Sequence, residues 1–230
     1  MIIPKIIVSV PFTGMKYPPR GDFITEFRMD FLKDELISDY IKKIDSVGGN
    51  IITIRDLEEG GKYKGSTEDK ITWMEKTENS ILDIEIKHID KIPGKLISQG
   101  RIILSYHRFN GMLSRKEIGD MVNSSEGSIV KIAMNVKDIN FAAKIADEFW
   151  GKAILVDISG NVVNRLILSF ISGVLYTYYR EKTGPGQIDY RTAIKLISSI
   201  KSVERNRINY DGGTNIMKLF DHKRGDIKYD

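Results

Sequence analysis

A single lysine interrupts an otherwise apolar segment, Ser128-Ile-Val-Lys131-Ile-Ala. Apolar surroundings favour a neutral amine over an ammonium group, and the neutral amine is the form that attacks a carbonyl carbon to make a Schiff base. Lys131 is therefore a candidate for covalent catalysis. The alternative is a lysine that snorkels from a strand end or pairs with an inward carboxylate such as Glu85.

A histidine near the end of another apolar segment is a candidate general base. In residues 101–107, a two-residue period places Ser105 and His107 on one face and Leu104 and Tyr106 on the other. His107 then lies at the carboxyl end of a strand, where barrel enzymes build their active sites. A lone histidine is more often structural, but a reactive lysine on the adjacent strand favours proton transfer by His107.

Charged residues alternate with apolar ones in two further segments, so one face of each segment is ionic. The charges are Glu26, Arg28 and Asp30 in residues 23–30, and Asp83, Glu85 and Lys87 in residues 82–87. The outer face of a sheet that is covered by helices must be apolar, so these charges are expected to point inward, where they need partners. The alternative is an exposed antiparallel strand with one solvated face.

Short β-branched segments alternate with amphipathic ones, the pattern of βα units around a parallel sheet. The expected strands cover residues 5–10, 23–30, 50–55, 82–87, 101–107, 128–133, 152–158 and 171–178. Apolar residues recur at helical spacing in 36–47, 139–149 and 193–200. Eight strands predict a closed (β/α)8 barrel of the α/β class. Prolines and glycines in residues 11–22 predict that a loop replaces helix 1.

Length and composition fit one domain of this kind. The chain has 230 residues, a net charge of +4 and no cysteine, which excludes disulfides and thiol catalysis and is typical of a reducing cytoplasm. No apolar stretch is long enough to cross a membrane, and the first residues are interpreted as a strand and not as a signal peptide. Basic and acidic residues are interleaved, so nucleic-acid binding is not expected. We expect a catalytic barrel at 1–203 and a polar tail at 204–230.

Several common motifs are not completed in this sequence. Gly60 and Gly65 have the spacing of a phosphate-binding loop, but Ser66 stands where that motif needs lysine. The chain has neither a Gly-x-Ser-x-Gly turn nor a His-Glu-x-x-His pair, and three scattered histidines do not make a zinc site. We therefore expect no metal and no cofactor.

Over about residues 5–200 the chain resembles the type I 3-dehydroquinate dehydratases, which are TIM-barrel, Schiff-base enzymes of the shikimate pathway. Seven segments carry the resemblance, in this order: Ile6-Ile-Val-Ser9, Glu26-x-Arg28-x-Asp30, Arg55-x-x-x-Glu59-Gly60-Gly61, Asp83-x-Glu85, Ser105-x-His107-x-Phe109, Lys131-Ile-Ala and Thr183-Gly-Pro-Gly-Gln187. Any one segment is a weak signal, whereas seven in register are a strong one.

The resemblance implies that the Lys131 amine condenses with the C3 ketone of 3-dehydroquinate and that the iminium acts as an electron sink while a C2 proton is removed. It implies that His107 takes this proton, helps expel the C1 hydroxyl as water and assists in forming and hydrolysing the imine, and that Glu59 orients the imidazole. The implied product is 3-dehydroshikimate. The same resemblance implies a cytoplasmic enzyme of aromatic amino-acid biosynthesis and leaves a homodimer open.

The resemblance also implies which residues bind the substrate. Arg165 would grip the substrate carboxylate through its planar fork of donors. The other implied contacts are Ser9, Glu26, Arg28, Arg55, Thr183 and Gln187. Residues 183–187 would close over the site as a lid. The stretch 170–179 is bulkier than the small residues that the family implies, which affects local packing and any dimer contact there.

Two other interpretations stay open at this point. Another Schiff-base barrel, such as a class I aldolase, would share Lys131 but would bind phosphate through glycine-rich backbone amides, whereas residues 183–187 present the side chains of Thr183 and Gln187. A basic barrel that binds RNA or another protein without catalysis would leave Lys131 and the charges of residues 23–30 unexplained.

Overall fold

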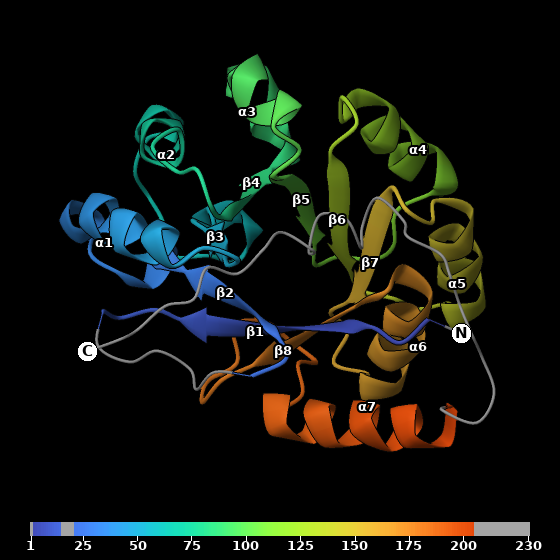
Figure 1. Cartoon of the computed structure of the whole chain (residues 1–230). Coiled ribbons are helices and arrows are strands. Elements are labelled where there is room, and N and C mark those ends of the chain that lie inside the picture. Colours follow the sequence, from blue (N-terminus) through green and yellow to red (C-terminus); the bar gives the residue numbers. More distant parts are fainter. Residues whose placement is uncertain (1, 15–20, 205–230) are drawn as a thin grey trace.

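The computed structural model describes residues 2–14 and 21–204, which contain an eight-stranded parallel sheet (Figure 1). The strands are β1 (Lys5–Pro11), β2 (Ile24–Arg28), β3 (Ile51–Thr53), β4 (Ile81–Glu85), β5 (Ile102–Arg108), β6 (Ile129–Met134), β7 (Ala153–Asp157) and β8 (Val174–Tyr178). Their order is β7-β6-β5-β4-β3-β2-β1-β8. The sheet curls into a nearly closed barrel, which confirms the predicted (β/α)8 architecture and excludes the antiparallel alternative.

Helices cover the outside of the barrel (Figure 1). They are α1 (Asp34–Val47), α2 (Thr67–Met74), α3 (Gly94–Ser98), α4 (Arg115–Ser124), α5 (Ile139–Glu148), α6 (Val162–Ser172) and α7 (Tyr190–Glu204). Short 3-10 helices follow three strands, at Met29–Phe31, Leu57–Glu59 and Ile86–Lys91. In the predicted loop between β1 and β2, residues 12–14 and 21–23 are not helical, and residues 15–20 lie outside the described part of the chain.

Local sequence explains where the helices begin and which way they face. At the start of α4 the Ser114 hydroxyl accepts a hydrogen bond from the backbone N–H of Glu117, and the Glu117 carboxylate accepts one from the backbone N–H of Ser114. Asn161 caps α6 in a similar way through its side-chain oxygen. In α1, Ile37 and Ile44 lie on one helical face and pack against the outer side of the barrel.

The inner face of the barrel is built in layers. The first layer is apolar and consists of Ile7, Ile24, Ile51, Ile81, Ile103, Ile129, Ile154 and Val174. Two residues further along each strand comes a second layer, which consists of Ser9, Glu26, Thr53, Asp83, Ser105, Lys131, Val156 and Tyr176. Because the apolar layer seals the amino ends of the strands, the polar second layer is open only toward their carboxyl ends. Glu26, Asp83 and Lys131 are buried there, as predicted.

Four predicted strand boundaries are wrong by two or three residues, at the ends of β2, β3 and β4 and at the start of β8. Strand β2 ends at Arg28, so Asp30 lies in the 3-10 helix Met29–Phe31. Strand β4 ends at Glu85, so Lys87 lies in the following 3-10 helix with its side chain 36% exposed and pairs with Glu58 at 2.8 Å. Lys87 therefore does not point into the barrel, because the strand ends two residues before Lys87. The residues at 171–172 end α6, and β8 begins only after Gly173, whose left-handed conformation (φ 77°) terminates that helix.

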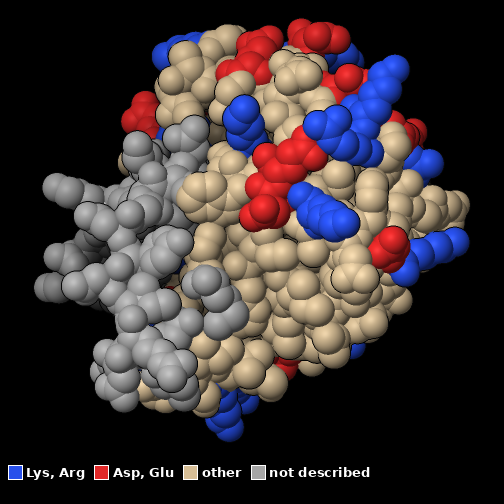
Figure 2. All heavy atoms as spheres, turned by 90° about the vertical axis from the view of Figure 1, so that its right-hand side faces the viewer, with Lys and Arg blue, Asp and Glu red and all other residues tan. Residues whose placement is uncertain are grey.

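The C-terminal boundary stays a prediction. Helix α7 runs to Glu204, and residues 205–230 of the predicted tail lie outside the described residues. No helix among the residues described is long and apolar enough to span a bilayer. On the face drawn in Figure 2, basic and acidic side chains lie beside one another in the upper part. Helix α6 exposes Val162, Val163 and Ile167, and a dimer contact near it also stays a prediction.

Candidate active site

A pocket lies at the carboxyl ends of the strands, above the polar second layer. All ten residues that the sequence singles out for catalysis or binding line this pocket, and they are Ser9, Glu26, Arg28, Arg55, Glu59, His107, Lys131, Arg165, Thr183 and Gln187. They come from strands, from the segments that follow strands and from one helix. The fold therefore brings the whole predicted set together in one place.

The amine of Lys131 lies at the bottom of the pocket, on a residue that is only 5% exposed. Its Nζ donates a hydrogen bond to Asp83 and lies 3.7 Å from Oε1 of Glu26. The lysine thus has an inward carboxylate partner, which is Asp83 and not Glu85, the example named in the alternative interpretation. Although burial opposes it, the positive charges of Arg55 and Lys131 lower the pKa of Asp83 well below its usual range, so Asp83 stays ionised and is a weak base.

Hydrogen bonds hold the two charged residues of β2 in place, from the neighbouring strands for Glu26 and from the 3-10 helix after β2 for Arg28. Glu26 accepts hydrogen bonds from the hydroxyls of Ser9 on β1 and Thr53 on β3, the latter at 2.9 Å. Arg28 pairs with Asp30 through two hydrogen bonds of 2.8 and 2.9 Å. These buried charges are therefore partnered before any ligand binds, and their side chains are fixed in one orientation.

His107 and Glu59 form a pair at the rim. Nδ1 of His107 lies 2.9 Å from Oε2 of Glu59, which ends the 3-10 helix after β3. Burial, with the positive charges of Arg55 and Lys131, lowers the pKa of His107 below its usual range. Burial raises the pKa of Glu59 to about 7. A neutral imidazole whose Nδ1–H is held by a carboxylate leaves Nε2 free to accept a proton.

Arg55 connects the lysine and histidine ends of the site. Its guanidinium donates to Asp83 at 2.6 Å and to Glu85 at 3.1 Å and lies 3.8 Å from Glu59. Although burial opposes it, the negative charge of Asp83 raises the pKa of Arg55. Arg55 is therefore a fixed cation that links the carboxylate partner of Lys131 to the carboxylate partner of His107.

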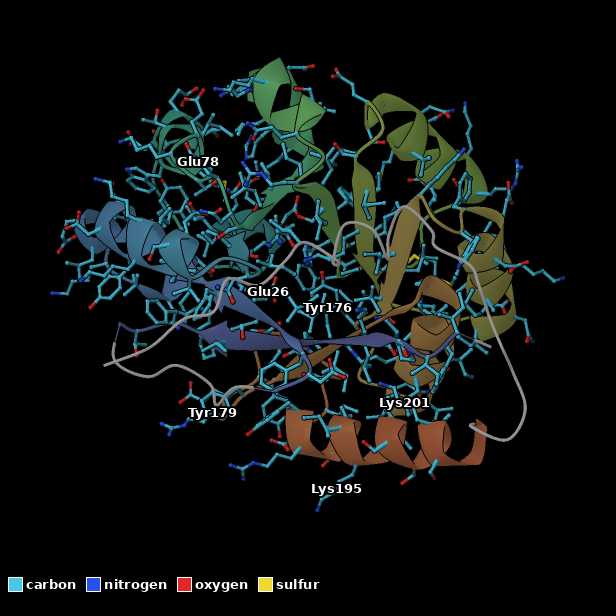
Figure 3. The ribbon with its side chains drawn as sticks, viewed as in Figure 1. Glu26, Glu78, Tyr176, Tyr179, Lys195 and Lys201 are labelled. Atoms are coloured by element: carbon cyan, nitrogen blue, oxygen red, sulfur yellow. The ribbon has the colours of Figure 1, made fainter. Side chains whose placement is uncertain are left out.

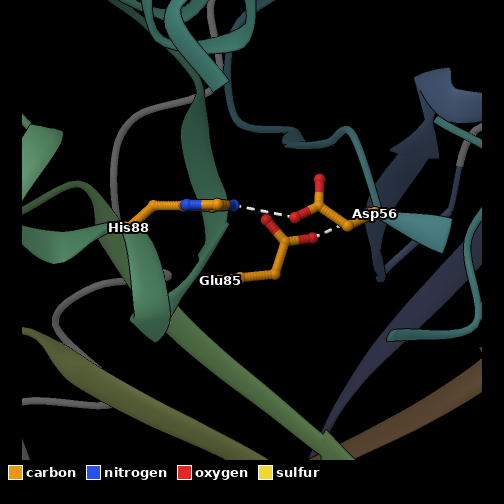
Figure 4. Close-up of side chains that lie close together, drawn as sticks. All are labelled: Asp56, Glu85 and His88. Carbon is orange, nitrogen blue, oxygen red and sulfur yellow. Dashed lines mark hydrogen bonds and ion pairs between the residues drawn. The ribbon is translucent and has the colours of Figure 1, made fainter. Parts of the chain in front are cut away.

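Glu85 is also part of a second cluster of titratable side chains (Figure 4). Asp56, Glu85 and His88 come close enough together to hold a metal ion, and Nε2 of His88 lies 2.7 Å from Asp56. The fully buried Lys70 of α2, however, donates hydrogen bonds to both Asp56 and Glu85. Arg55 also pairs with Glu85, and Lys87 pairs with Asp56. These three cations neutralise the two carboxylates, so the cluster is explained by an ion-pair network and not by a metal.

The segment at 183–187 lies across the mouth of the pocket and is braced from two sides. Oε1 of Gln187 accepts hydrogen bonds from the backbone N–H groups of Thr183, at 2.8 Å, and Gly184, at 3.1 Å. Arg28 donates to the carbonyl oxygen of Thr183 at 3.2 Å. The carbonyl oxygen of Pro185 accepts a hydrogen bond from a guanidinium nitrogen of α6. The segment has the position expected of a lid.

That guanidinium belongs to Arg165, which differs from the other buried cations of the pocket. Among the described residues no carboxylate forms an ion pair with it, and its Nε has no hydrogen-bond partner. Burial lowers its pKa to about 10, with only partial compensation from the charge of Asp157. A buried cation without an anion is costly, so this part of the pocket is suited to the carboxylate of a ligand.

Comparison with known proteins assigns the chain to a family. The family model described as type I 3-dehydroquinase matches residues 20–204. The chain belongs to this family. The 3-dehydroquinate dehydratases of Methanocaldococcus jannaschii and Methanococcus maripaludis are 30% and 31% identical to it, over 78% and 82% of this chain and 88% and 91% of their own. A structure of this dehydratase from Geobacillus kaustophilus matches with a TM-score of 0.65 at 17% identity, covering 90% of this chain and 93% of its own.

As a type I 3-dehydroquinase, the chain is a hydro-lyase of the shikimate pathway, in which it serves aromatic amino-acid biosynthesis. A second dehydratase structure, from Aquifex aeolicus, shows the same barrel with a TM-score of 0.65 at 22% identity, covering 84% of this chain and 98% of its own. The family match rules out the aldolase and the non-catalytic binding barrel as descriptions of this chain.

Sequence reasoning missed three residues that shape this dehydroquinase site. Asp83 was expected to point inward but not to contact the Lys131 amine. Lys70 is part of an ordinary amphipathic helix pattern, so nothing marks it as a buried ion-pair partner. Tyr176 lines the pocket from β8, and its ring centre lies 4.8 Å from the Lys131 amine. The only sequence signal for Tyr176 is the unusual bulk of residues 170–179.

Proposed function

We propose that this chain dehydrates 3-dehydroquinate through a Schiff base on Lys131, with His107 as the general acid and base. The observation that carries the proposal is that a buried lysine amine, a histidine held by a carboxylate and a buried arginine without an anion line the same pocket. Each group supplies one requirement of the reaction, namely covalent activation, proton transfer and substrate binding.

The reaction begins when the Lys131 amine, after losing a proton, attacks the C3 carbonyl carbon of the substrate. Asp83 is in hydrogen-bond contact with Nζ and orients the amine for the attack. Loss of water from the carbinolamine gives an iminium, whose positive charge acidifies the C2–H bond. The carboxylates of Asp83 and Glu26 then face the positive charge of the iminium and stabilise it.

His107 moves the proton between C2 and the leaving oxygen. Its Nε2 accepts the C2 proton, and the electron pair of that bond is held by the iminium as an enamine. The imidazolium then gives a proton to the C1 hydroxyl, which leaves as water, and hydrolysis of the imine releases 3-dehydroshikimate and restores the amine. Glu59 holds Nδ1 throughout and stabilises the transient imidazolium.

Arg165 is the proposed carboxylate receptor, and the remaining predicted residues complete the binding site. Ser9, Glu26, Arg28, Arg55, Thr183 and Gln187 line the pocket as polar or charged groups. A substrate with several hydroxyl groups finds donors and acceptors on all sides of such a pocket. The same proposal includes a cytoplasmic location and a possible homodimer.

The test uses the full chain with 3-dehydroquinate and borohydride. Turnover is followed by the ultraviolet absorbance of the conjugated product, and borohydride reduction during turnover is followed by intact mass and peptide mapping. We expect turnover and a reduced adduct on Lys131. Dehydration without any adduct would overturn the Schiff-base step but not the reaction, whereas the absence of both would overturn the proposed function.

Replacement of Arg165 by methionine is expected to weaken substrate binding more than it slows chemistry. Loss of a charge-assisted bidentate contact corresponds to a rise in KM of about 10- to 100-fold, with a smaller change in kcat. The ligand-free variant is expected to unfold at the same or a higher temperature, because a buried charge without an anion has been removed. Steady-state kinetics and thermal unfolding check the two effects, and an unchanged KM would contradict the assignment.

The pH dependence of kcat/KM is expected to report Glu59. Because the pKa of Glu59 is about 7 and that of His107 lies below its usual range, His107 is already neutral when Glu59 ionises. Only the ionised carboxylate accepts the Nδ1 proton and leaves Nε2 as the base, so kcat/KM is expected to rise with pH and to level off above about pH 7.

Glu59→Gln is the variant that checks this assignment. It cannot ionise, so the rise near pH 7 is expected to disappear while some activity persists at all pH values. Measurement of kcat/KM from about pH 5 to about pH 9 for both proteins decides the matter. A rise that stays in place in Glu59→Gln would assign it to another group.

A further inference from the structure

The polar second layer of the barrel contains one hydroxyl that differs from the rest. Ser9 and Thr53 donate to Glu26, and Ser105 accepts from Arg55. The hydroxyl of Tyr176, in contrast, has no hydrogen-bond partner among the residues that the structure describes. Buried polar groups are nearly always hydrogen-bonded, so this exception in the layer that carries the reactive lysine needs an explanation.

Tyr176 lies inside the barrel, whereas Tyr179, three residues later, lies outside it (Figure 3). Tyr176 is 5% exposed and lines the pocket, so its unpartnered hydroxyl is buried in the site itself. Its ring lies beside the ammonium group of Lys131, with 4.8 Å between Nζ and the ring centre. The ring of Tyr176 therefore lies beside the atom to which a substrate carbon would bond.

The hydroxyl is suited to donate and not to accept a proton. Burial, together with the negative charges of Glu26 and Asp83, raises the pKa of Tyr176 well above its ordinary value. It therefore stays protonated over the whole range in which the enzyme would work. A protonated phenol deep in a pocket offers one directed O–H to a ligand oxygen.

We propose that Tyr176 is a further substrate-binding residue, whose hydroxyl donates a hydrogen bond to a substrate oxygen on or next to the carbon that bonds Lys131. This inference rests on the proposed function. The ring of Tyr176 contacts the ammonium group of Lys131. The hydroxyl forms its hydrogen bond only when the substrate supplies an acceptor oxygen. The unpaired hydroxyl costs stability in the free enzyme, and substrate binding gains the hydrogen bond that the free enzyme lacks.

Tyr176→Phe removes one oxygen atom and keeps the ring beside Lys131. We expect kcat/KM for 3-dehydroquinate to fall by about 10- to 100-fold, the cost of leaving a substrate oxygen without its donor in a dry site. We expect the ligand-free variant to unfold at the same or a higher temperature, because a buried hydroxyl without a partner is lost. A purely structural tyrosine would not give this combination.

Tyr63→Phe is the matched control. Tyr63 is also buried, at 3% exposure, but its hydroxyl donates to the carbonyl oxygen of Ser66 at 2.9 Å outside the pocket. Its loss is expected to lower the unfolding temperature and to leave kcat/KM unchanged. A wild-type-like kcat/KM in Tyr176→Phe, or a lower unfolding temperature for it, would overturn the inference. Absence of turnover by the unmodified chain would instead overturn the proposed function.

Discussion

Lys131→Ala is expected to abolish both turnover and the adduct trapped by borohydride. No other described lysine amine lines the pocket, so none can replace it as the nucleophile. Loss of a covalent nucleophile lowers kcat by at least about 10⁴-fold in well-studied enzymes, and a loss on that scale is expected here. Intact mass and peptide mapping after reduction, together with kcat, measure the two effects.

Lys131→Arg separates the charge of the residue from its nucleophilicity. Guanidinium keeps the positive charge that Asp83 and Glu26 require, but it is not deprotonated in proteins and forms no Schiff base. We therefore expect a folded and inactive protein. Lys152→Ala, at an exposed lysine just before β7 and hence at the opposite end of the barrel, is expected to keep full activity and the full adduct.

Lys131→Ala is also expected to be less stable than the unmodified protein. Lys131→Arg keeps the positive charge and so separates this loss of stability from the loss of the nucleophile. Removal of one partner from a buried ion pair costs about 3 to 5 kcal/mol when the remaining charge is left alone. Asp83 keeps its contact with Arg55, and Glu26 keeps its two hydroxyl donors, so a smaller loss is expected here. An adduct that persists in a folded Lys131→Ala protein would contradict the role of Lys131.

The sequence alone predicts the direction of the reactive side chains because a strand has a period of two. Once residues 128–133 are assigned to a strand with an apolar outer face, Lys131 must point inward, and the same holds for Glu26 and Asp83. The apolar first layer then leaves the carboxyl ends as the only open side. These two constraints predict where the strand residues of the pocket lie. Other pocket residues lie outside the strands and are implied only by the family resemblance, namely Glu59, Arg165, Thr183 and Gln187.

The partners of these side chains depend on geometry that the sequence does not encode locally. The strand register places Glu85 opposite Ser105, and Ser105 opposite Lys131, so the ladder alone favours Glu85 as the lysine partner. Strands in a barrel are tilted against its axis, and residues paired along the ladder lie at different depths. The tilt brings Asp83 to the Lys131 amine and leaves Glu85 to Lys70 and Arg55.

Long-range packing accounts for the other differences. Lys70 reaches the barrel from α2, where a lysine beside other charged residues is expected to be exposed to solvent. Whether the hydroxyl of Tyr176 finds a partner depends on residues from several strands, so a sequence pattern cannot reveal it. Lys87 continues the alternation of β4 in the sequence, but the alternation of residue types does not encode where the strand ends.

The charges of the site explain why an anionic substrate suits it. The carboxylates of Glu26, Asp83 and Glu85 face the cations Arg55, Lys70 and Lys131, so the charges beneath the pocket are close to balanced. The positive charge without a counterpart lies at Arg165, near the mouth. In the proposed mechanism, a carboxylate bound there would orient the rest of the substrate toward Lys131 and His107, which line the same pocket.

His107→Ala is expected to stop the reaction after the Schiff base has formed. General acid–base groups contribute about 10²- to 10⁴-fold, so kcat is expected to fall on that scale. The Lys131 amine and its partner Asp83 do not contact His107 in the hydrogen-bond network, and the reduced adduct is therefore still expected on Lys131. Retention of the adduct with loss of dehydration separates proton transfer from imine formation, and kcat within about 10-fold of the unmodified enzyme would show that another group moves the C2 proton.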